Sequence, residues 1–296
     1  MHVFVTGASG FVGSAVVQEL INAGHSVLGL ARSDASADRL IAAGAGVHRG
    51  SLDDLESLKA GAAAADGVIH TGFIHDFSKF QENCETDRRA IEAMGSVLIG
   101  TTKPLVITSA TGLFNLGRIV TESDKATPET SFNPRRASEE AADAVAGQDV
   151  NVSVVRLPPS VHDAGDHGFV PMLINLAREK GAAAYIGEGL NRWPAVHRLD
   201  AANLYRLALD KNEKKAVYHA IGDPGIPFRE ITDLIGKNLN LPVVSKAGED
   251  AAQHFGWFLH FASMDSPASS EQTRNVLNWA PTHKGLIADL DSEAYF

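Results

Sequence analysis

The chain of 296 residues lacks several features that mark whole classes of protein. Its single cysteine, Cys84, excludes an internal disulfide framework. No apolar run approaches the roughly 20 residues that a membrane-spanning helix needs. The first residues carry no basic segment followed by an apolar core, as a secretory signal would. These absences predict a soluble, cytoplasmic protein in a reducing compartment, with no membrane partner.

Positive charge is also scarce. The chain has 26 lysines and arginines against 36 aspartates and glutamates, a net charge of −10. No basic stripe is present to neutralise phosphates, so we expect no nucleic-acid partner. His162 and His167 are five residues apart rather than at the i, i+4 spacing of a helical zinc site, so we predict no metal. No Gly-x-Ser-x-Gly motif or Cys/His pair indicates a hydrolase.

A regular alternation of two patterns is present instead. Short β-branched runs alternate with amphipathic helical stretches. The predicted strands are 2–6, 26–31, 46–49, 67–71, 104–109, 151–157 and 216–221. The predicted helices are 11–24, 35–43, 55–62, 84–99, 134–147 and 200–211. Such alternation implies parallel strands, and strands apolar on both faces imply helices on both sides. The pattern therefore predicts an α/β fold, a Rossmann doubly wound parallel sheet with a smaller C-terminal substrate lobe.

The alternation loosens after Leu157, which predicts a second domain. Residues 158–193 contain prolines, glycines and one helix near 169–180, and from Asp223 onward the pattern is of short helices and loops. Ligands of open α/β sheets bind beyond the carboxyl ends of the strands, so we expect the lobe to cover that crevice. The predicted dinucleotide-binding domain comprises 1–157 and 194–222, and the substrate lobe comprises 158–193 and 223–296.

Residues 2–13 place a strand, a glycine-rich turn and a helix in direct succession. Gly7 permits a tight turn, Gly10 lets the backbone approach a pyrophosphate, and Gly13 lets the helix pack closely on the strand. Free amides and the dipole at the helix start favour an anion. The spacing Gly-x-x-Gly-x-x-Gly differs from the standard fingerprint, but its setting is the required one. The segment predicts a dinucleotide site.

The end of the second strand favours NADP(H) over NAD. A site for NAD usually has an acidic residue there, which bonds the ribose hydroxyls. Here the strand ends in Arg32 and Ser33, and the first acidic residue is Asp34. A guanidinium and a hydroxyl can hold a 2′-phosphate. The alternative is a solvated loop arginine.

Several motifs together resemble the short-chain dehydrogenase/reductase superfamily, in particular its extended and atypical members that are NAD-dependent epimerase/dehydratase-like. The similarity covers nearly the whole chain. It is carried by Thr6–Gly13, Gly50–Leu52, Val68–His70, Arg156–Val161, Arg192–His197 with Asp200, and Thr273–Arg274. With the turn and the second strand, it gives the predicted cofactor contacts: Gly7, Ser9, Gly10, Phe11, Val12, Gly13, Arg32, Ser33, Ser51, Leu52, His70, Thr71, Pro158 and Val161.

In that superfamily a serine, a tyrosine and a lysine one helical turn later catalyse hydride transfer. Ser109 lies at the serine position and is implied to hold a substrate oxygen, although a strand-end serine can instead bond nearby backbone. Arg135 stands in place of the tyrosine and Glu139 in place of the lysine. We favour an exposed ion pair between them, worth about 0.3–0.5 kcal/mol. The alternative makes Arg135 a substrate clamp, and Arg192 is the other predicted substrate contact.

Without the tyrosine, another group must supply a proton. His162 is the leading candidate, because it follows the turn after the sixth strand and an imidazole titrates near neutral pH. His75 and Asp76, in the loop after the fourth strand, are weaker candidates. Asp87 replaces the asparagine of the superfamily's active site.

Two functions remain open. The first is an NADP(H)-dependent oxidoreductase or epimerase/dehydratase-like enzyme that acts on a small carbonyl or hydroxyl substrate. The second is a non-catalytic NADP(H)-binding redox sensor or regulatory protein. The missing tyrosine and lysine favour the second, and the substrate lobe with its Arg192-Trp193-Pro194 segment favours the first. The resemblance also implies a homodimer.

Overall fold

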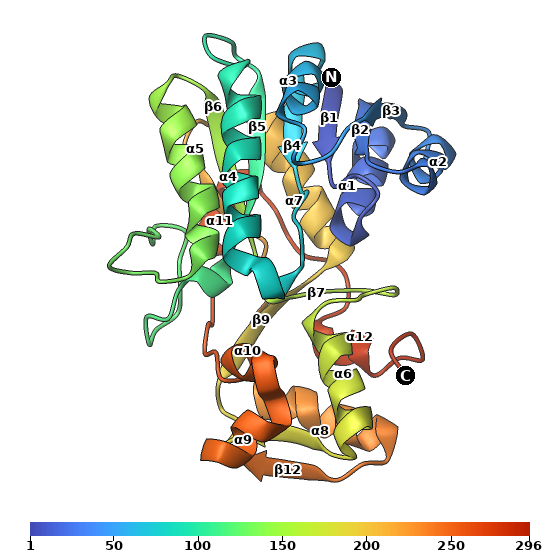
Figure 1. Ribbon diagram of the computed structural model, residues 1–296, viewed down its shortest axis with the longest axis vertical. Coiled ribbons are helices and arrows are strands. Elements are labelled where there is room, and N and C mark those ends of the chain that lie inside the picture. The colour runs from blue at the N-terminus through green and yellow to red at the C-terminus, as the bar shows by residue number, and fades with distance from the viewer.

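The computed structural model describes residues 1–296 and shows a large α/β part above a smaller lobe (Figure 1). The large part is built on a seven-stranded sheet of order β10-β6-β5-β4-β1-β2-β3, in which every pair is parallel. Its strands are β1 (His2–Thr6), β2 (Ser26–Ala31), β3 (Gly46–Arg49), β4 (Gly67–His70), β5 (Pro104–Ala110), β6 (Asn151–Leu157) and β10 (Val217–His219). The Rossmann doubly wound fold predicted from the sequence is confirmed.

Helices cover both faces of this sheet, as its apolar strands require. One face packs on α1 (Phe11–Asn22), α2 (Asp34–Ala42) and α7 (Arg198–Lys211). The other packs on α3 (Leu55–Ala64), α4 (Phe80–Ser96) and α5 (Ala137–Gly147). Each face has its own apolar core, and the sheet separates the two. None of the helices is long and apolar enough to cross a bilayer.

The smaller lobe contains two short sheets and a third apolar core. The first sheet joins β7 (Ser160–His162), β9 (Arg192–His197) and β11 (Asp223–Pro227), and the second pairs β8 (Ala183–Ile186) with β12 (Val243–Lys246). Its helices are α6 (Phe169–Lys180), α8 (Phe228–Leu239), α9 (Gly248–Phe255), α10 (Leu259–Ala262) and α12 (Leu286–Leu290), whereas α11 (Glu271–Leu277) packs on the large part against α7 and β10. Trp193 and Phe228 are fully buried in this core, with ring centroids 5.0 Å apart. Within 194–222, β9 joins the small sheet, whereas α7 and β10 pack with the large one.

Four short 3-10 helices complete the chain. They are η1 (Phe77–Lys79), η2 (Thr111–Leu113), η3 (Pro134–Arg136) and η4 (Gly256–Phe258). Of these, η1 lies in the loop between β4 and α4, and η4 lies in the lobe. The loops after β1, β4 and β5 leave the same edge of the sheet, because parallel strands place their carboxyl ends together. The candidate site lies at this edge.

Candidate functional site

The glycine-rich turn joins β1 to α1 and is shaped by its three glycines. Gly7 has a φ of +65°, which side chains strongly disfavour. A Cβ on Gly13 would lie 2.1 Å from the Gly7 carbonyl oxygen, so only glycine lets the helix sit this close. Gly10 is exposed and precedes α1 without a side-chain cap, which leaves the first amides of the helix free. The turn therefore forms a cradle of N–H groups suited to an anion.

The predicted contacts around this turn that carry side chains are all half-buried. Ser9, Phe11 and Val12 are half-buried at the start of α1. Thr71 is half-buried beside the turn, and its hydroxyl donates to the Thr6 carbonyl at 2.7 Å. These groups frame the cradle without filling it.

A cavity of about 160 Å³ lies farther along the same edge. It is lined by Leu52, Asp53, Leu55 and Arg89, from the loop after β3 and the helices α3 and α4. Ser51 directly precedes the lining residue Leu52 and is half-buried. Two apolar side chains and an arginine can hold a planar ring between them.

The end of β2 carries Arg32 exposed, as a phosphate contact requires. Ser33 already has a structural role: its hydroxyl oxygen accepts the Ser36 amide at 3.2 Å and caps α2. Asp34 pairs with Arg49 at 2.6 Å, on exposed side chains. A second guanidinium therefore lies next to the junction of β2 and α2.

His70 lies beneath the site rather than on its surface. The imidazole is fully buried, with Nδ1 2.6 Å from the Thr6 hydroxyl and Nε2 3.0 Å from Asp87. The predicted direct contact between His70 and a cofactor is therefore not supported by the structure, because protein groups occupy both ring nitrogens. The ring instead ties β1 and β4 to α4.

The expected exposed ion pair between Arg135 and Glu139 is wrong. Both side chains are buried, and each pairs with a different partner. Arg135 donates to Asp87 at 2.5 Å and to the Thr108 carbonyl at 3.0 Å, and its guanidinium lies 4.1 Å from the centre of the Phe73 ring. Burial alone would raise the pKa of Asp87, but Arg135 and His70 outweigh it and hold that pKa well below its usual range.

Glu139 pairs with Arg156 of β6. Two guanidinium nitrogens of Arg156 donate to the two carboxylate oxygens at 2.7 and 2.8 Å, a bidentate bond. Ser109 donates its hydroxyl to the same carboxylate at 2.7 Å. Arg156 also contacts His219 at 3.2 Å, and burial together with this arginine lowers the pKa of His219 to about 3. The four positions of the superfamily's active site thus hold a serine and three charged residues, all neutralised: Arg135 and Asp87 pair with each other, and Glu139 pairs with Arg156 from outside the four.

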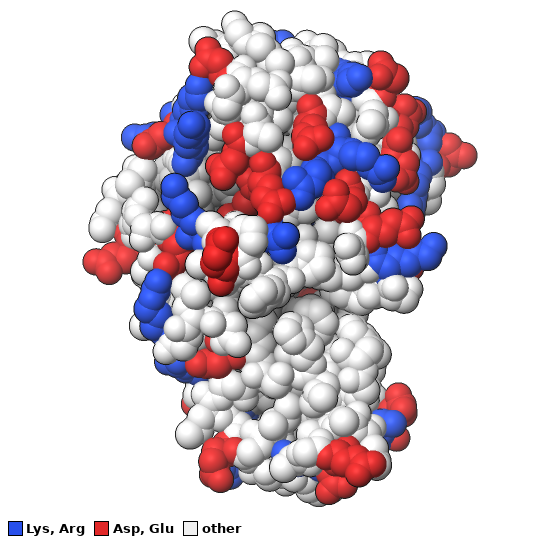
Figure 2. All heavy atoms as spheres, turned by 60° about the vertical axis from the view of Figure 1, so that its left-hand side comes forward, with Lys and Arg blue, Asp and Glu red and all other residues white.

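The loop between β4 and α4 lies against the lobe through aromatic rings. Phe77 is centred 5.5 Å from Trp257, 5.5 Å from Phe261 and 5.7 Å from Phe169. These rings are half-buried or exposed. Figure 2 shows a hollow between the large part and the lobe, bordered mainly by uncharged residues. The meeting point of loop and lobe is therefore an apolar, aromatic surface.

His162 and Arg192 are both held by carboxylates. The His162 ring is fully buried in β7, with Nδ1 2.9 Å from Asp289 and no hydrogen-bond partner for Nε2. The predicted open position in the cleft is therefore wrong for His162, because the ring is packed into the small sheet beside β9. Arg192 makes a bidentate bond with Asp265, both contacts at 3.0 Å, and is half-exposed.

Of the two other predicted contacts, Pro158 is buried at the end of β6, and Val161 is half-buried in β7. They follow the strand that carries Arg156, so they lie at the same sheet edge as Ser109, which pairs with Arg156 in the strand register.

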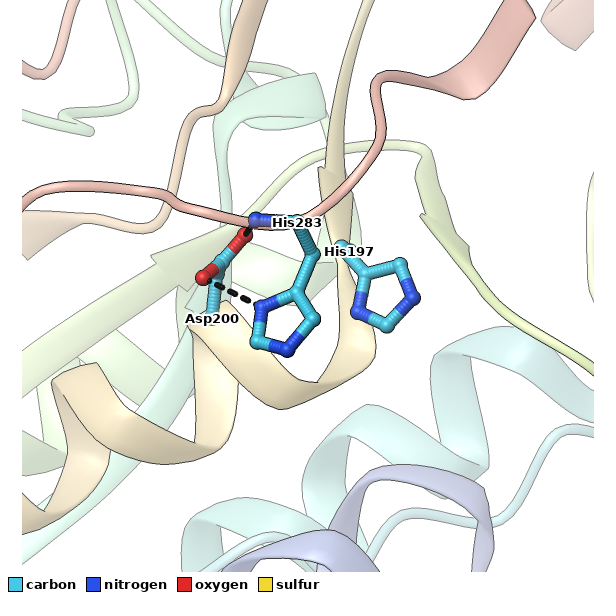
Figure 3. Close-up of side chains that lie close together, drawn as sticks. All are labelled: His197, Asp200 and His283. Atoms are coloured by element: carbon cyan, nitrogen blue, oxygen red, sulfur yellow. Dashed lines mark hydrogen bonds and ion pairs between the residues drawn. The ribbon is translucent and has the colours of Figure 1, made fainter. Parts of the chain in front are cut away.

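A group of His197, Asp200 and His283 has atoms close enough to suggest a metal site (Figure 3). Asp200 accepts the Nδ1 proton of His283 at 2.8 Å and two backbone amides of the C-terminal segment at 3.0 and 3.1 Å. Nδ1 of His197 accepts the Leu199 amide and caps α7. These bonds use Nδ1 of both histidines and both oxygens of Asp200, so the cluster fastens the C-terminal segment to α7. Sequence spacing could not reveal it, because His283 is distant in the chain.

The cradle, the cavity and the parallel sheet together define a nucleotide-binding α/β protein of the doubly wound class. The chain belongs to the NAD dependent epimerase/dehydratase family, whose model matches residues 3–221. The resemblance read from the sequence motifs is thereby confirmed.

Two proteins of similar sequence and one solved structure of similar fold illustrate this membership. It is 52% identical to the uncharacterised protein C2A9.02 of Schizosaccharomyces pombe over 297 residues, which covers 100% of both chains. It is 29% identical to 2-alkyl-3-oxoalkanoate reductase of Stenotrophomonas maltophilia, over 83% of this chain and 78% of the reductase. The solved structure of DesIV, a dTDP-glucose 4,6-dehydratase of Streptomyces venezuelae with NAD bound, shares the fold. Its TM-score is 0.76 at 18% identity, over 98% of this chain and 96% of that one.

Proposed function

We propose that the protein is an NADP(H)-dependent oxidoreductase that acts on the carbonyl or hydroxyl group of a small, largely apolar molecule. The observation that carries this proposal is the cradle of Gly7, Gly10 and Gly13, where side chains are absent and helix amides are free. Such a cradle suits the pyrophosphate of a dinucleotide. The cofactor, when bound, supplies or accepts the hydride.

With the pyrophosphate at the cradle, three further groups along the same sheet edge would contact the rest of the cofactor. The adenine ring fits the cavity beside Leu52 and Arg89, since base stacking needs apolar and guanidinium surfaces. Arg32 is exposed where a 2′-phosphate would lie, and Ser33, the cap of α2, adds the start of a helix that favours anions. This arrangement supports NADP(H) rather than NAD. Pro158 and Val161 would lie beneath the nicotinamide.

The substrate side is apolar. The rings of Phe77, Phe169 and Phe261 meet between the loop and the lobe, and such surfaces favour hydrophobic ligands. The related reductase from Stenotrophomonas acts, by its name, on 2-alkyl-3-oxoalkanoates, which are alkyl-bearing carbonyl compounds. Ser109 is the proposed contact to the substrate oxygen. Its hydroxyl donates to Glu139 in the structure, and a hydroxyl can rotate toward another acceptor.

A specific observation also supports the second candidate, a non-catalytic NADP(H)-binding regulator. The tyrosine, lysine and asparagine positions hold Arg135, Glu139 and Asp87, all buried and all in ion pairs. An arginine cannot donate a proton near neutral pH. A regulator would need none of this chemistry.

Turnover separates the two candidates. The purified full chain is mixed with NADPH and a set of ketones and aldehydes, among them 2-alkyl-3-oxoalkanoates, and the absorbance of the reduced nicotinamide is followed. The enzyme predicts NADPH oxidation that falls at least tenfold in Ser109→Ala. Tight NADPH binding without oxidation on every compound would establish the regulator instead.

A further inference from the structure

His75 lies in the loop between β4 and α4, at the edge where the candidate site opens. It is one of the few titratable side chains there that is not bound into an ion pair. Its imidazole is exposed and stands at 77° to the Phe73 ring, with centroids 5.2 Å apart. The guanidinium of Arg135, which occupies the tyrosine position, lies over the face of the same Phe73 ring. Phe73 thus connects His75 to the position of the missing catalytic residue.

The other candidates for moving a proton are held by partners. Arg135 cannot release a proton near neutral pH. Protonating Glu139 would leave the charge of Arg156 buried without a counter-ion, which is strongly unfavourable. His162 is fully buried against Asp289.

Two exposed imidazoles remain at this edge. His167 lies against Phe11 at the start of α1, with ring centroids 5.7 Å apart, whereas His75 lies against the Phe73 ring that contacts Arg135. His75 is therefore the imidazole linked to the position of the missing tyrosine, and an imidazole can both take up and release a proton.

We propose that His75 is the catalytic proton-transfer residue of this oxidoreductase, in place of the family's tyrosine. The inference rests on the proposed oxidoreductase function. In alcohol oxidation the hydroxyl proton of the substrate passes to a ring nitrogen of His75, and the hydride of the carbinol carbon passes to NADP⁺. A carbonyl product and NADPH result, and His75 then releases its proton to water. Reduction runs the same steps in reverse.

The charged groups around His75 suit this role. Neighbouring protein atoms remove part of the hydration of this exposed ring, which lowers the pKa of His75. Arg135 and His167 lower that pKa further, while the Phe73 carbonyl and Asp87 act in the opposite direction. Its loop neighbour Asp76 bonds to Ser78 instead. A neutral imidazole at physiological pH is the form that accepts a proton from an alcohol. We therefore expect oxidation to slow as the pH falls below about 6.5, and reduction to slow as the pH rises through the same range.

The test compares pH profiles of oxidation by the full-length wild-type chain, His75→Gln and a matched control. Probes are 1-phenylethanol, 4-phenyl-2-butanol and cyclohexanol with NADP⁺. Glutamine keeps hydrogen-bonding capacity but does not titrate. The control is His254→Gln, because His254 is a half-buried lobe histidine whose pKa is also lowered by burial. NMR titration of the imidazole protons, with the His75 signal assigned by its loss in the variant, gives the midpoint independently.

We expect His75→Gln to lower kcat about 100-fold or more with little change in KM, and to abolish the acidic limb of the profile. His254→Gln should keep the wild-type kcat and the acidic limb of the pH profile. The midpoint of the His75 titration measured by NMR should match the midpoint of the kinetic profile. If His75→Gln keeps the wild-type kcat and the acidic limb of the pH profile, the role of His75 is overturned and the oxidoreductase function is not. No turnover on any probe or on the carbonyl set, with NADPH binding intact, would overturn the oxidoreductase function together with it.

Discussion

At the residue scale, the buried ion pair of Arg156 and Glu139 contributes to the stability of the fold. The sequence does not show this pair, because the two residues come from different elements. Arg156 is 1% exposed, and removing it leaves a carboxylate without its main counter-charge. We expect Arg156→Met to lower the free energy of unfolding by about 3–5 kcal/mol, measured by urea denaturation. The matched control is Arg136→Met, whose pair with Glu140 is about one-third exposed. The control should cost about 0–1 kcal/mol, and equal losses in both variants would contradict the structure.

The second residue-scale prediction concerns His219. Its pKa is about 3 in the folded chain, whereas an unfolded histidine titrates near 6.5. The unfolded state therefore binds a proton between these values and the folded state does not. Its contribution to stability is complete above pH 6.5 and decreases as the pH falls, by up to about 1.4 kcal/mol per pH unit.

Denaturation of the wild-type chain between pH 5 and 7.5 should show this slope. We expect His219→Gln to reduce it, because the variant has no proton to take up on unfolding. Substitution of the exposed His260 by Gln serves as the control and should leave it unchanged. An unaltered slope in His219→Gln would show that another group is responsible.

Which site residues the sequence predicts depends on how local their chemistry is. The turn of Gly7, Gly10 and Gly13 was predictable, since its strand, turn and helix are contiguous. Arg135 and Glu139 were misinterpreted because i, i+4 spacing suggests a pair, whereas their partners Asp87 and Arg156 come from other elements. Only the packing of α4, α5 and β6 reveals those partners.

At the scale of elements, the junction of β2 and α2 should decide the choice of dinucleotide. Arg32 is exposed there and lies next to the start of α2. We expect Arg32→Ala to weaken NADPH binding by about 10- to 100-fold, the effect of losing a charge-assisted hydrogen bond, and to leave NADH binding nearly unchanged. Calorimetric titration with both nucleotides measures this. An equal loss of NADPH and NADH affinity in Arg32→Ala would mean that Arg32 has a structural role instead.

The elements of the large sheet were predictable to within a few residues, because buried parallel strands read as apolar β-branched runs. The predicted helix 84–99 begins earlier, at Phe80, and the predicted helix 134–147 starts as the 3-10 turn η3 before α5. The strands of the lobe were not predicted. They are three to six residues long, and β11 contains two prolines and a glycine, so no periodic pattern marks them.

At the scale of the whole molecule, the outer face of α4 and α5 is charged. Arg88 bonds to both Glu85 and Glu140, and Arg136 bonds to Glu140 at 2.8 Å. Figure 2 shows residues of both signs interspersed over the large part. Stable dimers bury more apolar surfaces than this. We therefore expect the homodimer that the family resemblance implies to leave this face exposed, so Arg88→Glu should not change the mass measured by light scattering at micromolar concentration. A stable dimer would require a different interface.

The most direct measurement is a calorimetric titration of the full chain with NADPH, beside Gly10→Ala and Gly147→Ala. A Cβ on Gly10 would lie 3.1 Å from the Gly7 carbonyl oxygen, so the turn must shift by a few tenths of an ångström to admit it, and the methyl group would stand where the anion approaches. A Cβ on Gly147 meets open space. We expect saturable heat in the wild type and in Gly147→Ala, with at least tenfold weaker binding in Gly10→Ala. A wild-type chain that releases no heat with either NADPH or NADH would contradict the dinucleotide site itself.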